Sequence, residues 1–143
     1  MTIHSIAQWH ERARPDPINE NFQVQLGCHF EEIHEMLDAL ECNDPHLLQD
    51  AMEAMNTLAV LLKSGAIGMT ITNRKEFLDG LADQVVTAVG TGHCAKMDMR
   101  RAVTEVDRSN WSKYDEEGNP IFNENGKIMK GPSYTPPNLE GMY

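Results

Sequence analysis

The stretch FEEIHEMLDAL, residues 30–40, decides the fold of this chain because it combines a helical spacing of apolar residues with a strongly acidic motif. Residues three and four apart lie on one face of a helix, so Glu32 and Glu35 point the same way. Like charges at this spacing repel each other, and the repulsion grows where the face is partly buried. A divalent cation would neutralise the pair.

A second acidic segment, EFLDGLAD at residues 76–83, has the same character. Asp79 and Asp83 lie one turn apart on a helix and repel each other in the same way. Carboxylates on two adjacent antiparallel helices would form an oxygen-rich site suited to Mg²⁺ or Mn²⁺ rather than to zinc. Acidic pairs on a helix are also common on solvated surfaces, and the spacing by itself leaves both interpretations open.

The chemistry implied by such a site is attack of water on a phosphoryl group, with the metal polarising the phosphate oxygens and activating the water. Glu31, directly beside the expected ligands, is the candidate catalytic residue that orients or deprotonates this water. His34 lies within the motif on a different face, so we interpret it as an exposed or supporting residue rather than a ligand.

Outward from these segments, apolar periodicity and capping residues predict five helices. They are residues 2–13, a helix capped by Asn19 and closed by residues 43–45, residues 45–63, a helix capped by Asn73 that ends or bends near residues 90–92, and residues 98–112. We expect Gly27 to serve close helix packing. The helix over 45–63 is apolar around much of its circumference, which predicts burial on two sides.

The pattern changes after Lys113. Residues 121–129, with a turn at 123–126, predict a small β-hairpin, and residues 131–137 are too rich in proline for a helix. We expect this tail to be extended over the helical body or a neighbouring subunit. The sequence therefore predicts a single all-α domain, residues 1–143, with a body of four to five helices over 1–113 and a hairpin and proline-rich tail over 114–143.

The composition excludes several classes of partner. The net charge of −10 disfavours duplex nucleic acid, whose phosphates require a positive surface. No apolar run approaches the roughly 20 residues of a membrane helix, and the N-terminus lacks a signal-peptide core, so we expect no membrane partner and a cytosolic location, in the host cytosol if a phage encodes the protein. Three cysteines without CxxC spacing indicate reduced thiols.

The motifs resemble those of the all-α nucleoside triphosphate pyrophosphohydrolases, the superfamily of MazG-like enzymes, dimeric dUTPases and phosphoribosyl-ATP pyrophosphohydrolase. Residues 31–35 match the EExxE motif, and residues 79–83 are similar to the second metal motif. Residues 105–113, with RSNWSK, and residues 126–137 are similar to the corresponding segments of MazG-like relatives. The resemblance covers most of the chain and is weakest over 45–63.

The resemblance implies a magnesium site, with manganese as an alternative. By position, Glu32 and Glu35 match the ligands of the first motif and Asp83 matches the last ligand of the second. The second motif of the family is usually ExxD, which would place a glutamate where this chain has Gly80. Asp79, one turn before Asp83, is the alternative ligand, and the number of metal ions stays open.

The resemblance also implies residues that bind the substrate. Asn110 and Lys113 match positions that face the nucleotide in relatives, and Lys127 or Lys130 in the tail would close over the phosphates. Arg108 is a further candidate, although such arginines are often ion-pair partners instead.

The implied activity is hydrolysis of a (d)NTP between the α and β phosphates, giving the (d)NMP and pyrophosphate, by a homodimer or homotetramer. A purine such as dGTP is the substrate we expect. Hydrolysis of phosphoribosyl-ATP is the nearest alternative. A non-catalytic helical oligomer, inactivated by the change at Gly80, is the alternative outside the enzymes.

Overall fold

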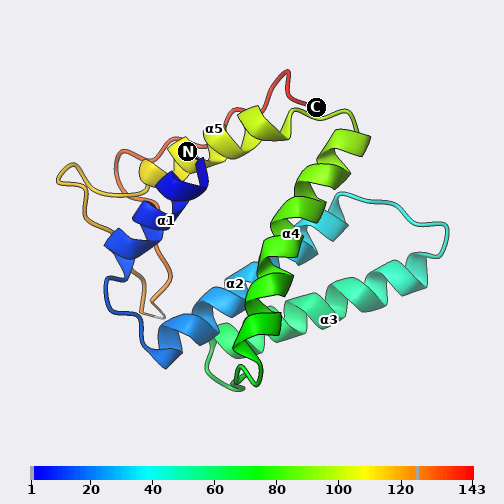
Figure 1. Ribbon diagram of the computed structural model, residues 1–143, viewed down its shortest axis with the longest axis horizontal. Helices are drawn as coiled ribbons and strands as arrows, with labels where there is room; N and C mark the ends of the chain where they lie inside the picture. Colours follow the sequence, from blue (N-terminus) through cyan, green and yellow to red (C-terminus); the bar gives the residue numbers. More distant parts are fainter. Residues whose placement is uncertain (1, 125) are drawn as a thin grey trace. The chain divides into compact units, whose positions relative to one another are not determined.

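The structure is a computed structural model that describes residues 2–124 and 126–143. These residues form five α-helices and no strand, which confirms the all-α class (Figure 1). The helices are α1 (Thr2–Ala13), α2 (Asn19–Asp38), α3 (Pro45–Lys63), α4 (Arg74–Cys94) and α5 (Met99–Trp111). No helix among them is long and apolar enough to cross a membrane.

The chain divides into two compact units. The α2–α3 unit comprises Asp16–Thr70 together with Asn123–Lys127. The α1–α4–α5 unit contains the chain as far as Pro15, then Ile71–Phe122 and Ile128–Tyr143. The acidic motif of α2 and the acidic segment of α4 thus belong to different units.

Three of the predicted helix starts are confirmed by their caps. The side chains of Asp44, Asn73 and Asp98 each accept a hydrogen bond from the backbone N–H three residues further on, at 3.1, 3.2 and 3.1 Å. An N-cap of this kind satisfies one of the N–H groups that a helix leaves without a partner, and contributes about 1 kcal/mol. The local sequence is therefore sufficient to place the starts of α3, α4 and α5.

Both predicted boundaries of α2 are wrong. The helix ends at Asp38 rather than at residues 43–45. Asn19 is the first residue of α2 rather than its cap, because Asn21 reaches back and its Oδ1 accepts the Ile18 N–H at 3.0 Å. The helix α4 runs through residues 90–92 and ends two residues later, at Cys94. A glycine in a helix costs only about 1 kcal/mol, which is too little to stop a capped helix of 21 residues.

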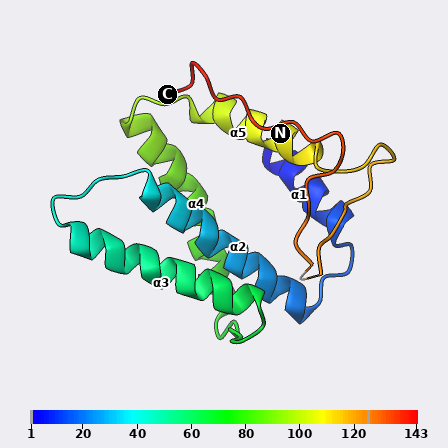
Figure 2. The ribbon, with the colours of Figure 1, turned by 180° about the vertical axis from the view of Figure 1, so that it is seen from behind.

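The α2–α3 unit is a pair of antiparallel helices that lie side by side (Figures 1 and 2). The predicted role of Gly27 in close packing is confirmed: a Cβ there would lie 2.9 Å from the Ala59 carbonyl oxygen and 2.8 Å from Lys63 Cγ. The helix α3 is packed on the side that faces α2, whereas Leu47 and Val60 are 64% and 52% exposed. The expected burial of α3 on two sides is not met within its unit.

The core of the α1–α4–α5 unit lies between α1 and the end of α5, where Trp9, Ala13 and Tyr114 are buried. Trp9 stacks on Tyr114 with ring centroids 5.6 Å apart, and the Tyr114 hydroxyl donates to the Trp9 carbonyl oxygen at 2.6 Å. Burial raises the pKa of Tyr114 to about 12. Trp9 is therefore a core residue, and the half-buried Trp111 packs against this core.

The predicted hairpin is reduced to one antiparallel bridge, Phe122–Ile128, in the described residues. Backbone hydrogen bonds from Asn123 to Lys127 and from Met129 to Ile121 flank it, at 2.9 and 2.7 Å. Asn125, within the predicted turn, lies outside the described residues.

The extended tail lies over the helical body, as expected, and runs antiparallel to α5 (Figure 1). The Gly131 N–H donates to the Lys113 carbonyl oxygen at one end of α5, and the Asp98 N–H donates to the Met142 carbonyl oxygen at the other end. Between them, the Ser109 hydroxyl donates to the Thr135 carbonyl oxygen at 2.9 Å. Because the prolines of the tail cannot donate backbone hydrogen bonds, side chains of α5 supply much of this contact.

Within its unit, α4 meets α5 where Gly92 lies against Met99, and an apolar stripe remains exposed along the helix. Leu78, Val85 and Val89 in this stripe are 68%, 50% and 47% exposed. A stripe of this kind on a helix normally packs against another surface.

Candidate functional site

The acidic motif of α2 separates into two parts. Glu32 and Glu35 are exposed on the solvent-facing side of the helix, one turn apart. Glu31 is half-buried and turns toward the end of α3. The two expected ligands are therefore exposed to solvent, whereas the expected catalytic carboxylate is half-buried against α3.

Glu31 is held by two lysines. Lys63 Nζ, from the last turn of α3, lies 2.6 Å from Glu31 Oε1, and Lys127 Nζ lies 2.9 Å from Glu31 Oε2. Partial burial opposes ionisation of Glu31, but the hydrogen bonds from both lysines outweigh it and lower the pKa of this carboxyl group. The same hydrogen bond raises the pKa of Lys127. The two lysines thus favour the ionised form of Glu31.

His34 does not point with Glu32 and Glu35. Its Nδ1 lies 3.2 Å from the Met52 carbonyl oxygen on α3, and the residue is half-buried. This placement agrees with the interpretation of His34 as a supporting residue.

Asp79 and Asp83 lie on the exposed polar side of α4, away from the apolar stripe. Between them, Gly80 is open: a Cβ there would meet no described atom within 4 Å. A side chain such as glutamate, which the resemblance leads one to expect here, would therefore fit without moving a neighbour. The juxtaposition of these aspartates with Glu32 and Glu35 stays a prediction, since the two helices belong to different units.

The donors that each unit offers are hard carboxylate oxygens, the type that Mg²⁺ prefers. Among the described residues there is no group of three or more His, Cys, Asp or Glu side chains that could hold a metal ion. Each unit by itself contributes one carboxylate pair, so Glu32 and Glu35 fit a magnesium ion that keeps several waters and takes further ligands from elsewhere.

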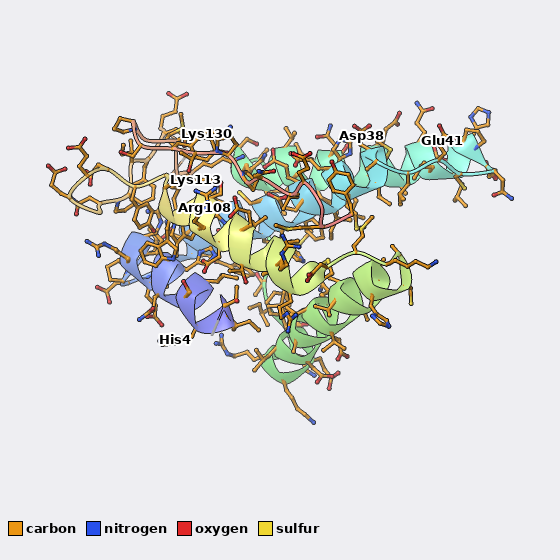
Figure 3. All side chains as sticks on the ribbon, turned by 90° about the horizontal axis from the view of Figure 1, so that it is seen from above. His4, Asp38, Glu41, Arg108, Lys113 and Lys130 are labelled. Carbon is orange, nitrogen blue, oxygen red and sulfur yellow. The ribbon has the colours of Figure 1, made fainter. Side chains whose placement is uncertain are left out.

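The other expected substrate-binding residues belong to the α1–α4–α5 unit. Figure 3 shows Arg108 on α5, Lys113 in the turn just after α5, and Lys130 on the tail. Lys113 Nζ lies 5.9 Å from the Trp9 ring centroid, and Lys130 Nζ lies 4.8 Å from that of Tyr134. Asn110 accepts the Trp9 indole N–H through its backbone carbonyl oxygen, at 2.9 Å.

Arg108 fastens the tail to α5. Its guanidinium forms an ion pair with Glu105 at 2.8 Å and also donates to the Thr135 hydroxyl and to the Pro136 carbonyl oxygen. The hydrogen bonds from Arg108 and from the Asn138 N–H lower the pKa of Glu105 to about 2. The alternative role of Arg108, as an ion-pair partner, is therefore the one realised in this contact.

Two features of the α2–α3 unit escape sequence reasoning. Lys63 lies 32 residues from Glu31, and a lysine in the last turn of a helix is ordinary, so no local signal predicts their contact. A cavity of about 510 Å³ opens between the ends of α2 and α3, with walls that include His34, Leu48 and Met52. Its walls come from two helices and the loop between them, and its size suits a small aromatic or apolar group.

Comparison of this chain with protein-family models, with curated proteins and with solved structures finds no match. The case for a function therefore depends on the motifs and on the geometry described above.

Proposed function

We propose that this protein is a magnesium-dependent nucleoside triphosphate pyrophosphohydrolase that acts on the cytosolic nucleotide pool. It cleaves a (d)NTP between the α and β phosphates and releases the (d)NMP and pyrophosphate, with a purine such as dGTP as the favoured substrate. Magnesium, or manganese, supplies the charge that neutralises the phosphates and activates water.

The observation that carries the proposal is that the glutamates of the EExxE motif lie in two different environments. Glu32 and Glu35 are exposed together on one side of α2, where they are accessible to a hydrated cation. Glu31, next to them, is kept ionised by Lys63 and Lys127. Two ligand carboxylates beside an ionised carboxylate that could orient water are the components that metal-assisted phosphoryl hydrolysis needs.

The remaining roles follow from the resemblance and from charge. Asp79 and Asp83 complete the ligand set, and Lys113, Lys130 and Asn110 face the nucleotide.

The test measures pyrophosphate release from a panel of (d)NTPs and phosphoribosyl-ATP in the presence of Mg²⁺. The compound that is hydrolysed fastest identifies the substrate. Glu35→Gln should lower kcat/KM by at least about a hundredfold, because it removes a ligand and its charge. The matched control is Glu20→Gln, a change of the same type in the first turn of the same helix, which should have full activity. Absence of pyrophosphate release from every substrate would leave the non-catalytic helical protein.

The proposal includes a homodimer or homotetramer formed through the apolar stripe of α4. Leu78, Val85 and Val89 are exposed along one side of α4, and a second copy of the chain would cover them. Val85→Glu should reduce the mass measured by light scattering to that of a monomer, while Thr87→Glu, on the opposite side of α4, should leave it unchanged. A monomeric wild-type protein at micromolar concentration would contradict this part.

A further inference from the structure

The contact between Glu31 and its two lysines has the form of an occupied anion site. Each oxygen of the carboxylate accepts from a different ammonium group, Lys63 at 2.6 Å and Lys127 at 2.9 Å. The two lysines come from the end of α3 and from the segment 123–127, so the arrangement depends on the tertiary fold. Two ammonium groups thus share one carboxylate, in a chain whose net charge is −10.

Both lysines are held in place by structure that does not involve Glu31. The stem of Lys63 crosses α2 at Gly27, where a Cβ would lie 2.8 Å from Lys63 Cγ. The backbone of Lys127 is fixed by Asn123, whose Oδ1 accepts the Lys127 N–H at 2.8 Å. The stem of Lys63 and the backbone of Lys127 are therefore preorganised, which lowers the cost of binding an anion.

The site is also accessible. The side chains of Lys63, Glu31 and Lys127 are 21%, 28% and 47% exposed. A phosphate group presents two oxygens side by side, as a carboxylate does, and lysine binds it as a point charge. Because a half-buried ammonium group without a partner is costly, any movement of Glu31 away from the pair favours the entry of another anion.

We propose that Lys63 and Lys127 form a binding site for a phosphate group of a polyphosphate, and that the Glu31 carboxylate occupies it in the ligand-free chain. The identity of the polyphosphate as a substrate rests on the proposed function, but the binding itself requires neither metal nor turnover. Lys63 is thereby assigned as a substrate-binding residue, and Glu31 exchanges its lysine partners when the phosphate arrives.

The test is calorimetric titration of the full chain with inorganic pyrophosphate in the presence of EDTA. Glu31→Gln keeps the shape of the side chain and removes the competing charge, so it should tighten pyrophosphate binding by about threefold to tenfold. Adding Lys63→Gln or Lys127→Gln to Glu31→Gln should remove this gain. The matched control, Lys75→Gln in the first turn of α4, should leave the affinity unchanged when added to Glu31→Gln.

The outcomes are distinct from those for hydrolysis. An unchanged or weaker affinity in Glu31→Gln, or equal binding by Glu31→Gln with and without the lysine substitutions, would overturn the site. Lys127 lies on an exposed segment, so its substitution tests the site even if the Lys63 variant unfolds. If the protein hydrolyses no (d)NTP but shows the expected pyrophosphate affinities, the proposed enzymatic function is refuted and the phosphate site is retained.

Discussion

Substitution of Gly27 by alanine provides a quantitative test of the α2–α3 packing. The added Cβ would lie 2.9 Å from the Ala59 carbonyl oxygen, whereas an ordinary contact is at least 3.4 Å. The helices must separate locally by about half an ångström, because a backbone oxygen cannot rotate away. Overpacking of this kind costs about 1–3 kcal/mol, and the better helix propensity of alanine returns about 1 kcal/mol. We expect a net loss of about 1 kcal/mol of unfolding free energy.

The matched control is Gly80→Ala. Gly80 also lies in the interior of a helix, α4, but a Cβ there meets no described atom within 4 Å. This substitution should raise the unfolding free energy by about 0.5–1 kcal/mol. Urea denaturation followed by circular dichroism measures both variants. A Gly27→Ala variant as stable as Gly80→Ala would refute the close approach of α2 and α3.

Three further predictions concern the other unit. Gly80→Glu should fold, since the position is open, and under the proposed function it should tighten Mg²⁺ binding several-fold, measured by calorimetry. Tyr114→Phe should cost about 1–2 kcal/mol in urea denaturation, because a buried backbone carbonyl oxygen loses its partner. The pKa of Glu105 is lowered to about 2 by Arg108 and by the Asn138 N–H, so the tail contact is intact above the ordinary value of 4.5 and is lost as the pH falls toward 2. The Asn138 amide resonance should titrate with this pKa, and Glu105→Gln should abolish the titration.

Local signals were sufficient for much of the fold. The starts of α3, α4 and α5 depend on caps between residues three positions apart, and the sequence therefore places these starts correctly. The predicted start of α2 is wrong because the sequence has two asparagines, Asn19 and Asn21, that could cap the helix. In the structure, Asn21 accepts the Ile18 N–H. The glycines near the end of α4 do not stop the helix at residues 90–92, because a long helix tolerates their free-energy cost.

In the candidate site, too, some features follow from local sequence and others from the tertiary fold. The periodicity of an α-helix is a local property, so the sequence by itself determined that Glu32 and Glu35 share one side of α2 and that Asp79 and Asp83 share one side of α4. Only the tertiary structure decided that Glu31 turns away from its neighbours to meet Lys63 and Lys127, which lie 32 and 96 residues away along the chain. Contacts over such separations depend on how helices pack, and Gly27 permits the close approach that brings Lys63 across α2.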